Sequence, residues 1–400
     1  MPKQWPQIAL AEILTERNET PYPALIKSGN IPIISKIRFS DGEFEYRAKS
    51  ETNTKMILIH PGDLVLSGIN AMKGAIAIYQ PETSQKAAAT IHYAAYKVNK
   101  EKADTRYLWW LLRSQYFQEI LSQQVPQGIK TELKAKRLLP VFVPLPSLLE
   151  QQRLADRLSR ISIKTSQLIS IHLKEKEECT NAIASYLQSL VLQLEKDNEI
   201  VPLEKLILQS GYGTSVKCSE ERNANSLPVL RIPNIASELT NFNNLKYASL
   251  ADFEKRKLSL EKGDLLIVRT NGSPTLVGRC AVIPDLQETI AFASYLIRIK
   301  VDQKLVVPEY IQLILRHQRN VGKLFDIAKT TAGQLNVSLG RIKKILIPIP
   351  HLQVQYETIS AFEKFQAYFS DIFILQDLLS GEINQLLASV VNNVLKENEN

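Results

Sequence analysis

Residues 62–74 read GDLVLSGINAMKG, and the same pattern returns at residues 263–278 as GDLLIVRTNGSPTLVG. A second element, Pro144-Leu145-Pro146, returns 204 positions later as Pro348-Ile349-Pro350. Near the N-terminus the two copies are closer together in the sequence. There Leu10-Ala11-Glu12-Ile13 aligns with Leu203-Glu204-Lys205-Leu206, which lies 193 positions later. The order of features is the same in both copies, so the chain contains an internal repeat of roughly 200 residues.

Two copies of such a long unit are too few for a solenoid, whose repeats are short and stack in larger numbers. They suit a single chain that imitates a two-fold dimer. A protein with internal two-fold symmetry binds a target with two related halves, and DNA is the commonest such target.

The composition is that of a globular protein with more than one domain. With about 100–200 residues per domain, 400 residues and 45.2 kDa correspond to two to four domains. The apolar fraction of 44% is enough to build real cores. No apolar run approaches the roughly 18 residues of a membrane span, and the N-terminal residues lack the apolar stretch of a signal peptide. We therefore expect a cytoplasmic protein.

Charge and cysteine usage narrow the range of partners. The formal charge of +8 and the pI near 9.1 favour a polyanionic partner, although many basic proteins bind no nucleic acid. Cys179, Cys218 and Cys280 lie far apart, with no Cys-x-x-Cys pair among them. We expect reduced thiols and neither a disulfide framework nor a zinc site.

Each copy reads as a mixed α/β part followed by a long helix. Leu265-Leu266-Ile267-Val268 is a buried-strand run entered through a Gly-Asp turn, and Pro308 stands where a helix begins. The polar segment 329–334 reads as a loop. The strands expected in the second copy are 226–232, 265–268, 279–283, 294–299 and 345–350. Those expected in the first copy are 31–35, the runs after Gly62-Asp63 and after Gly74, 90–98 and 139–145, with a helix from about residue 104.

Two long helices are expected after these α/β parts. Residues 147–201 contain neither proline nor glycine, and no proline follows Pro350. As one helix the first stretch would extend about 80 Å. Apolar stripes run along both stretches, so the helices are expected to pack on each other as an antiparallel coiled coil. The alternative is two separate amphipathic helices, each lying on its own domain. The second stripe follows a heptad through Phe362, Phe365, Phe369, Ile372, Gln376, Leu379, Ile383, Leu386 and Val390.

The ordered set of motifs resembles the specificity subunit of type I restriction–modification systems. The residues that carry the likeness are Tyr212-Gly213-Thr214-Ser215, Leu227-Pro228-Val229-Leu230-Arg231-Ile232, Gly263-Asp264-Leu265-Leu266, Gly278-Arg279 and Ile347-Pro348-Ile349-Pro350. Their partners in the first copy are Ile31-Pro32-Ile33, Gly62-Asp63-Leu64-Val65, Gly74, Val143-Pro144-Leu145-Pro146 and Glu150-Gln151-Gln152. The likeness covers essentially the whole chain. The first copy lacks a clear Tyr-Gly-x-Ser segment.

The resemblance implies an α+β fold with two tandem α/β target recognition domains related by pseudo-two-fold symmetry. It places them at 1–146 and 199–350, with long helices at 147–198 and 351–400. Each domain would read one half of a split, asymmetric site on double-stranded DNA, and the helices would fix the gap between the halves. The helices would also dock two adenine-N6 methyltransferase subunits, and a restriction and translocase subunit would join for cleavage. The residues expected to contact these partners are Leu154, Leu158, Ile161, Phe362, Phe369 and Ile383.

Catalytic readings find little support in the sequence. An adenine methyltransferase needs an Asn/Asp-Pro-Pro-aromatic motif, and the only Pro-Asn pair is Pro233-Asn234, in the wrong order. The phosphate-binding Gly-x-x-x-x-Gly-Lys-Ser/Thr loop is absent, and Gly211-Tyr212-Gly213 is only a lone Gly-x-Gly. We expect a non-catalytic DNA reader without cofactor or metal. The alternatives are an orphan or inactive specificity protein, a protein scaffold that has lost DNA reading, and, least supported, an independent enzyme.

Base reading needs polar side chains on loops, with lysine or arginine nearby for phosphate contacts. Three segments of the second copy meet this need, and two of them have partners in the first. The candidates in the second copy are Arg269, Thr270, Asn271, Ser273, Lys329, Thr330, Thr331, Gln334, Tyr212, Thr214, Ser215 and Lys217. The candidates in the first copy are Asn70, Lys73, Gln127, Lys130 and Thr131. For Asn271-Gly272 the alternative is a simple turn pair.

Overall fold

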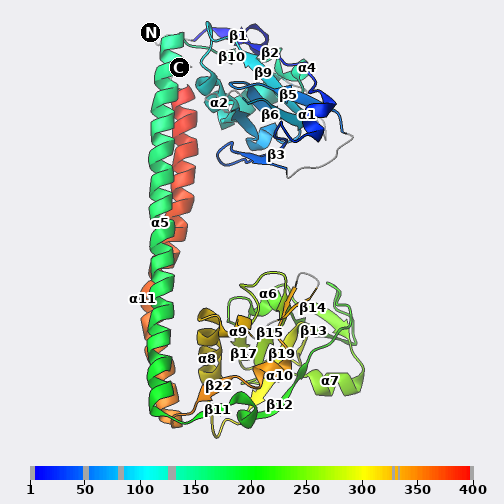
Figure 1. The fold of residues 1–400 in the computed structure, drawn as a ribbon, viewed down its shortest axis with the longest axis vertical. Helices are drawn as coiled ribbons and strands as arrows, with labels where there is room; N and C mark the ends of the chain where they lie inside the picture. Colours follow the sequence, from blue (N-terminus) through cyan, green and yellow to red (C-terminus); the bar gives the residue numbers. More distant parts are fainter. Residues whose placement is uncertain are drawn as a thin grey trace. The chain divides into compact units, whose positions relative to one another are not determined.

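The computed structural model describes residues 5–47, 54–79, 85–124, 132–326, 329–331 and 334–396. Its contacts divide the chain into two compact units (Figure 1). Unit 1 comprises Met1–Leu173 with Gln376–Asn400, and unit 2 comprises Lys174–Leu375. Each unit contains one α/β part and a portion of both long helices, α5 (Leu148–Asp197) and α11 (Leu352–Lys396). The division passes through both helices, so the predicted domain boundaries stay a prediction.

Unit 1 is built on a four-stranded antiparallel sheet in the order β2, β9, β6, β7. All four residues of the central strand β6 are buried, as its continuous apolar run predicts. Because successive side chains point to opposite faces, Leu64 and Leu66 join the core under α2 and α3, while Val65 joins a second core with Ile34 and Tyr79. The strands of unit 1 are β1 Gln7–Ala9, β2 Leu14–Glu16, β3 Ile34–Ile37, β4 Phe44–Tyr46, β5 Met56–Ile59, β6 Leu64–Ser67, β7 Ile76–Ile78, β8 Ala87–Thr90, β9 Tyr93–Val98 and β10 Phe142–Pro144. Its shorter helices are α1 Pro23–Lys27, α2 Thr105–Arg113, α3 Gln115–Gln124 and α4 Ala135–Leu138, with 3₁₀ turns η1 Leu10–Glu12 and η2 Ala71–Lys73.

Unit 2 repeats this arrangement with the sheet order β12, β19, β15, β17. Its central strand β15 is again buried throughout, with Leu265 and Ile267 in one core and Leu266 and Val268 in the other. The strands of unit 2 are β11 Ile200–Pro202, β12 Ile207–Tyr212, β13 Ser226–Leu230, β14 Lys246–Ser249, β15 Leu265–Val268, β16 Thr270–Asn271, β17 Cys280–Val282, β18 Ala291–Phe292, β19 Leu296–Val301, β20 Lys329–Thr331, β21 Gln334–Asn336 and β22 Leu346–Pro348. Its shorter helices are α6 Ile232–Ile235, α7 Asp252–Leu258, α8 Pro308–Asn320, α9 Lys323–Asp326 and α10 Leu339–Ile342, with the 3₁₀ turn η3 Leu203–Leu206.

One secondary-structure prediction is wrong. The segment predicted as a polar loop contains β20 and β21, which pair antiparallel with Lys329 opposite Asn336 and Thr331 opposite Gln334. Strand β21 also pairs with β16, so the three form a small sheet of their own. Polar composition hides these strands because their stability comes from pairing with a distant segment rather than from their own apolar pattern.

The two long helices pack on each other within each unit, and they run in opposite directions. In unit 2 the ring of Tyr186 on α5 stacks on that of Phe365 on α11, with centroids 4.1 Å apart, and Lys176 lies over Phe373. Lower numbers on α5 therefore meet higher numbers on α11. In unit 1 both helices contribute buried residues to one hydrophobic core: Leu154, Ala155 and Leu158 from α5, and Val391, Val394 and Leu395 from α11.

The predicted heptad of α11 is wrong at two positions. Ile372 is 40% exposed and Leu386 is 63% exposed, while their neighbours Phe373 and Leu387 pack against the cores. A straight helix has 3.6 residues per turn, so its buried stripe drifts away from a strict seven-residue repeat.

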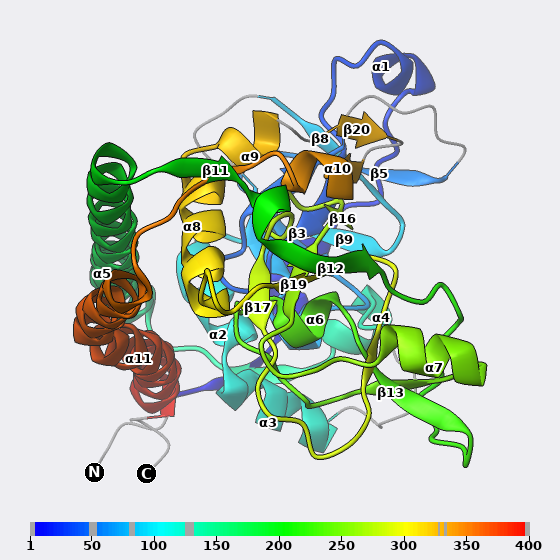
Figure 2. The ribbon, with the colours of Figure 1, turned by 90° about the horizontal axis from the view of Figure 1, so that it is seen from below.

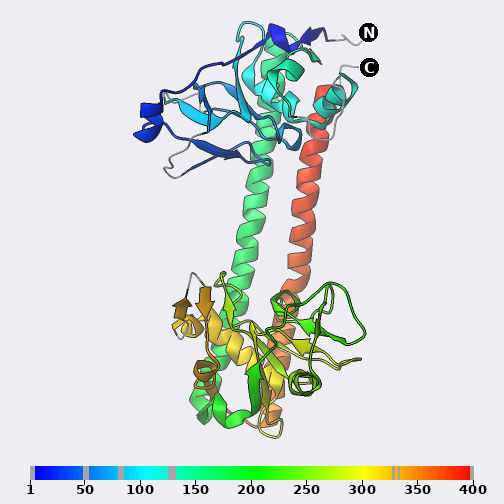
Figure 3. The same cartoon turned by 90° about the vertical axis from the view of Figure 1, so that its right-hand side faces the viewer.

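Short helices connect each sheet to the long helices. In unit 2, α8 lies between the sheet and the segments of α5 and α11 that belong to this unit (Figures 1 and 2). Pro308 occupies its first turn, as predicted. In unit 1, α3 lies beside the last turns of α11 (Figure 3), where the Asn392 side chain accepts a hydrogen bond from the Tyr116 N–H and Lys396 pairs with Glu119 at 2.6 Å.

Candidate nucleic-acid interface

Two of the predicted segments of unit 2 meet just after the central strand β15. The N–H of Arg269 donates to the carbonyl of Tyr295 at 3.0 Å, and the N–H of Val337 donates to the carbonyl of Arg269 at 2.8 Å. Beyond this point Thr270 lies opposite Asn336 in the β16–β21 ladder. The loop after β15 and the hairpin β20–β21 are therefore one structural feature.

The third predicted segment joins them through Tyr212. The guanidinium of Arg269 lies over the Tyr212 ring, 4.5 Å from its centroid, and Arg269 Nε donates to Asn336 Oδ1 at 3.4 Å. The Tyr212 hydroxyl accepts a hydrogen bond from the Leu339 N–H at 3.2 Å. Tyr212 is 40% exposed and Arg269 is partly exposed, so a positive group is held in a set position at the surface.

The remaining candidates after β12 differ in exposure. Ser215 and Lys217 are exposed. Thr214 is only 6% exposed, and its hydroxyl accepts a hydrogen bond from the Val216 N–H at 3.1 Å. Thr214 also forms an isolated β-bridge with Ala293, and its contact with DNA stays a prediction.

Asn271 is engaged in a local turn. Its side-chain oxygen accepts a hydrogen bond from the Ser273 N–H at 2.8 Å, and the Ser273 hydroxyl lies 2.8 Å from that of Thr275. This is the turn that the alternative reading of Asn271-Gly272 expects. The amide nitrogen of Asn271 has no part in that bond. For Lys329, Thr330, Thr331 and Gln334 the structure describes the backbone strands only.

Unit 1 repeats the same backbone connections. The N–H of Gly68 donates to the His92 carbonyl at 2.8 Å, and the N–H of Leu133 donates to the Gly68 carbonyl at 2.8 Å. Asn70 and Lys73 lie in the loop that follows, at the two ends of η2, and Lys73 is exposed. Gln127, Lys130 and Thr131, the other candidates of this copy, lie outside the described residues.

A carboxylate lies within this part of unit 1. Glu132 is 3.1 Å from Lys134 and 3.2 Å from His92. Burial of the Glu132 carboxyl acts to raise its pKa, but hydrogen bonds from Lys134 and His92 outweigh burial and lower the pKa. Glu132 is therefore charged at neutral pH and offsets part of the positive potential of Lys134.

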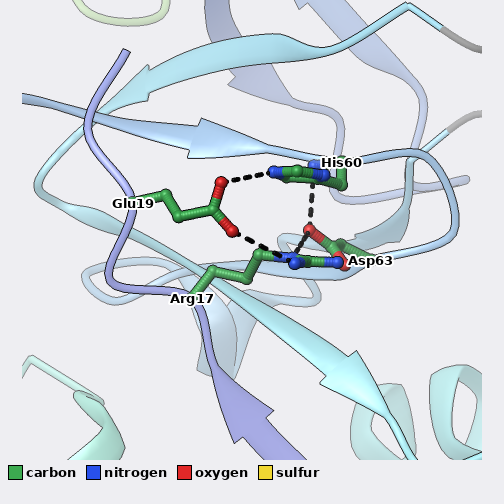
Figure 4. Close-up of polar contacts among 4 residues, drawn as sticks. All are labelled: Arg17, Glu19, His60 and Asp63. Carbon is green, nitrogen blue, oxygen red and sulfur yellow. Dashed lines mark hydrogen bonds and ion pairs between the residues drawn. The ribbon is translucent and has the colours of Figure 1, made fainter.

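The Gly-Asp motif has a structural role at the opposite end of the central strand. Arg17 Nε donates to both oxygens of Asp63, at 3.1 and 2.8 Å, and the His60 N–H donates to Asp63 Oδ2 at 2.9 Å (Figure 4). Glu19 bridges Arg17 and His60 at 3.2 and 2.8 Å. The hydrogen bond with Asp63 is the main cause that raises the pKa of Arg17. Asp63 thus closes the turn that leads into β6 and lies away from the polar loop that follows this strand.

Sequence reasoning missed Asn336, which fixes the Arg269 guanidinium. No local pattern identifies it, because it reaches Arg269 only through the pairing of β21 with β16. The predicted partner contacts differ in exposure. Leu154, Leu158 and Phe362 are at most 6% exposed and pack in the cores, whereas Ile161, Phe369 and Ile383 are partly exposed. All six stay predictions.

Across the described ranges, no three His, Cys, Asp or Glu side chains are grouped so that they could hold a metal ion. Within the same part of the chain, no helix is long and apolar enough to cross a membrane.

The sequence matches the family described as the type I restriction modification DNA specificity domain twice, over residues 2–178 and 195–373. The chain belongs to this specificity family. The predicted resemblance is therefore confirmed, and the double match agrees with the two α/β parts of the structure.

Named relatives of this specificity protein are themselves specificity subunits. It is 25% identical to the type I restriction enzyme EcoKI specificity subunit of Escherichia coli over 264 residues, which are 63% of this chain and 55% of that protein. It is 22% identical to the StySPI specificity subunit of Salmonella potsdam, over 71% of this chain and 62% of that protein. The matches thus span less than two thirds of these relatives.

Solved structures share the fold at low sequence identity. One comes from a study of complex assembly and conformational transition in a type I restriction–modification system. It has a TM-score of 0.72 and 14% sequence identity, and the match covers 99% of this chain and 98% of that chain. Another is the HsdS subunit from Thermoanaerobacter tengcongensis, with a TM-score of 0.52, 15% identity and coverage of 100% and 98%. These likenesses confirm the tandem α/β fold with two long helices.

Proposed function

We propose that this chain is the DNA-reading subunit of a type I restriction–modification complex. Each α/β part reads one half of a bipartite, asymmetric site on double-stranded DNA, and the chain itself catalyses no reaction. The observation that carries the proposal is the repeated connection in both units, where the turn after the central buried strand is hydrogen-bonded to a second polar segment. A rigid sheet that presents paired polar loops is the usual support for base-reading side chains.

The preset guanidinium of Arg269 supports this role in unit 2. An arginine held by an aromatic ring and an amide oxygen loses little side-chain freedom when it binds a guanine edge or a phosphate. Ser215 and Lys217 add exposed hydrogen-bonding and positive groups beside Tyr212. The net charge of +8 favours the approach to DNA.

Family membership supports an inference about partners and location. We infer that two methyltransferase subunits supply the chemistry, that restriction and translocase subunits join them, and that the complex works in the cytoplasm. The names of the relatives, which are subunits of type I restriction enzymes, support this assignment. Ile161, Phe369 and Ile383 on the long helices are candidates for partner contacts, because their side chains are partly exposed.

A methylome tests the proposal. The chain is expressed with a candidate type I methyltransferase subunit from the same organism, in a host without DNA methylation, and modified adenines are mapped by single-molecule sequencing. We expect a two-part motif with a fixed gap, present only when this chain is included. A stable complex that leaves no new motif would contradict DNA reading and favour an inactive specificity protein or a scaffold.

A domain exchange tests the assignment of one half-site to each unit. Residues 1–146 are replaced by the corresponding region of a related specificity subunit, and the methylome is mapped again. One half of the motif should change while the other half stays the same. A change in both halves would show that the two α/β parts do not read independently.

A further inference from the structure

A groove of about 410 Å³ lies on unit 2 between α8 and α11. Apolar side chains of Leu313, Ile359 and Phe362 form part of its lining, and the segment 237–239 borders it. Leu313 and Phe362 are 7% and 3% exposed, so they belong to the core of unit 2 and hold the groove in place. The groove is separate from the polar loops that follow β15.

The internal repeat shows which side chains suit this position. In unit 1 the residues of α2 equivalent to Gln312 and Leu313 are Trp109 and Trp110. Trp109 Nε1 donates to the Ile76 carbonyl at 2.9 Å, just as Gln312 Nε2 donates to the Cys280 carbonyl at 2.8 Å.

The indole rings of unit 1 pack where unit 2 has its groove. The rings of Trp109 and Trp110 meet edge to face at 4.6 Å. Trp110 is 8% exposed and reaches α5, where its Nε1 donates to the Ser159 hydroxyl at 3.4 Å. Ser159 corresponds to Glu363 of the groove. Unit 2 has smaller side chains on α8, so the space that indole fills in unit 1 is open.

The charged residues around the groove indicate which residues would flank an inserted aromatic side chain. Glu309 and Glu363 line it, are exposed, and make no ion pair within the described part of the chain. A third carboxylate, Glu238, is paired with Arg316 and Arg319. Arg316 lies 5.1 Å from the Phe362 ring centroid.

The two exposed carboxylates leave this rim acidic, although the whole chain carries +8. An acidic rim repels DNA and attracts a cation. We propose that the groove is a docking site for a partner protein chain, which inserts an aromatic side chain flanked by lysine or arginine. The ring enters between α8 and α11, on the apolar floor of Leu313 and Phe362. The flanking cation lies beside the carboxylates of Glu309 and Glu363. Aromatic anchors in such pockets are the residues that dominate protein–protein binding.

A fluorine-labelled peptide tests the groove on the full chain. The probe is an acetylated and amidated Ala-Lys-Trp-Lys-Ala peptide with 5-fluorotryptophan, observed by ¹⁹F NMR line broadening. Unlabelled Ala-Lys-Trp-Lys-Ala should displace it. Ala-Lys-Ala-Lys-Ala should not displace it. Ala-Glu-Trp-Glu-Ala should require at least about a tenfold higher concentration, because two charges change sign and each then repels the carboxylates instead of attracting them. Equal displacement by the acidic peptide or by the peptide without tryptophan would overturn the proposal.

Two variants connect binding to this groove. The filled variant, Gln312→Trp with Leu313→Trp, carries the side chains that unit 1 has at the equivalent positions. It should no longer broaden the ¹⁹F line of the probe. Leu208→Trp, at a site that is 65% exposed on β12, adds a surface indole elsewhere and should still broaden that line. If the filled variant fails to fold, Glu309→Gln with Glu363→Gln keeps the test decisive, since both are surface changes. This pair should weaken probe binding about three- to tenfold, and unchanged binding would overturn the proposal.

A second copy of this chain is the competing occupant. Sedimentation velocity of the wild-type and the filled variant distinguishes the two cases. The proposal expects the same concentration-independent state for both. Self-association that disappears when the groove is filled would assign the groove to a second copy and overturn the proposal as stated.

Discussion

The side-chain oxygen of Gln151 accepts a hydrogen bond from the backbone N–H of Asp104 at 2.8 Å. The amide nitrogen of Gln151 donates to the carbonyls of Lys102 and Pro146, at 3.0 and 2.8 Å, and the residue is fully buried. One side chain therefore joins the first turn of α5, the end of the proline-bounded strand and the start of α2 within unit 1.

Unit 2 contains the same connection. Gln355 accepts from the Val307 N–H at 2.9 Å and donates to the carbonyls of Leu305 and Pro350 at 3.1 and 2.9 Å. Each of these glutamines stands five residues after the last proline of a Pro-x-Pro motif, and it fixes the long helix to its own α/β part.

Gln151→Ala should lower the free energy of unfolding of unit 1 by about 1–3 kcal/mol, because it leaves buried backbone groups without partners. Gln355→Ala should do the same to unit 2. Urea unfolding, together with hydrogen exchange at the start of each long helix, measures the effect. The exposed neighbour Gln152→Ala is the control and should change stability by less than about 0.5 kcal/mol. Equal effects at Gln151 and Gln152 would contradict the structural role.

Gly213→Ala should destabilise unit 2 and disturb the position of Tyr212. A Cβ atom at residue 213 would lie 2.1 Å from the Phe292 carbonyl oxygen and 2.5 Å from that of Ala293, so the backbone must shift. The expected cost is about 1–3 kcal/mol. Gly211→Ala is a matched control, since a Cβ there meets no atom within 4 Å. Thermal unfolding of both variants checks the prediction, which fails if the two behave alike.

Tyr212→Ala and Arg269→Ala should weaken DNA binding through one shared interaction. The ring holds the guanidinium, so removing either partner should cost about 1–3 kcal/mol for the DNA half read by unit 2, and the double variant should cost little more. Fluorescence anisotropy of the assembled complex on duplexes that carry the methylome motif measures these values. Tyr368→Ala, at a 79% exposed site on α11, is the control. Fully additive losses would show that the ring does not position Arg269.

Lys329→Ala should weaken binding to all DNA sequences alike and reduce the slope of log affinity against log salt by about one. The reason is the loss of one phosphate contact without loss of a base contact. Anisotropy titrations at several salt concentrations, on cognate and unrelated duplexes, give both numbers. A loss confined to the cognate duplex would instead make Lys329 a base reader.

Asp264 should make the stability of unit 2 depend on pH, in the opposite sense to a carboxylate that is paired with a cation. Burial raises its pKa above the ordinary 3.8, and its Oδ1 has no hydrogen-bond partner among the described residues, whereas Asp63 is paired with Arg17. The folded state therefore holds this proton more tightly than the unfolded state. Stability from this group is highest at low pH and falls as pH rises from about 3.8 through the folded pKa.

Asp264→Asn removes this titration and retains an acceptor for the Glu261 N–H, which is 3.0 Å from Asp264 Oδ2. The variant should gain stability over the wild type at pH 7, by about 1.4 kcal/mol for each unit by which the pKa was raised, and the gain should shrink toward pH 4. Urea unfolding at both pH values measures the difference. A difference that stays constant with pH would contradict a buried, titrating Asp264.

Much of the framework was predictable from local patterns. The strand at residues 265–268, the helix from Pro308 and the two long helices follow from apolar runs and proline positions, because burial of one face imposes a period on the sequence. The hairpin β20–β21 and the position of Thr214 were not predictable in this way. Their surroundings depend on residues far along the chain. A polar segment has no apolar periodicity from which its pairing partner could be predicted.

By itself the sequence determined that the chain consists of two copies of one unit, each with a buried central strand, polar loops and a long helix. Repetition and apolar spacing can be read directly from the order of the residues, without knowledge of the fold. Only the tertiary structure decided that Tyr212, Arg269 and Asn336 come together and that Thr214 turns inward. Arg269 and Asn336 are 67 positions apart, and they meet because strand pairing and core packing bring distant segments to one place.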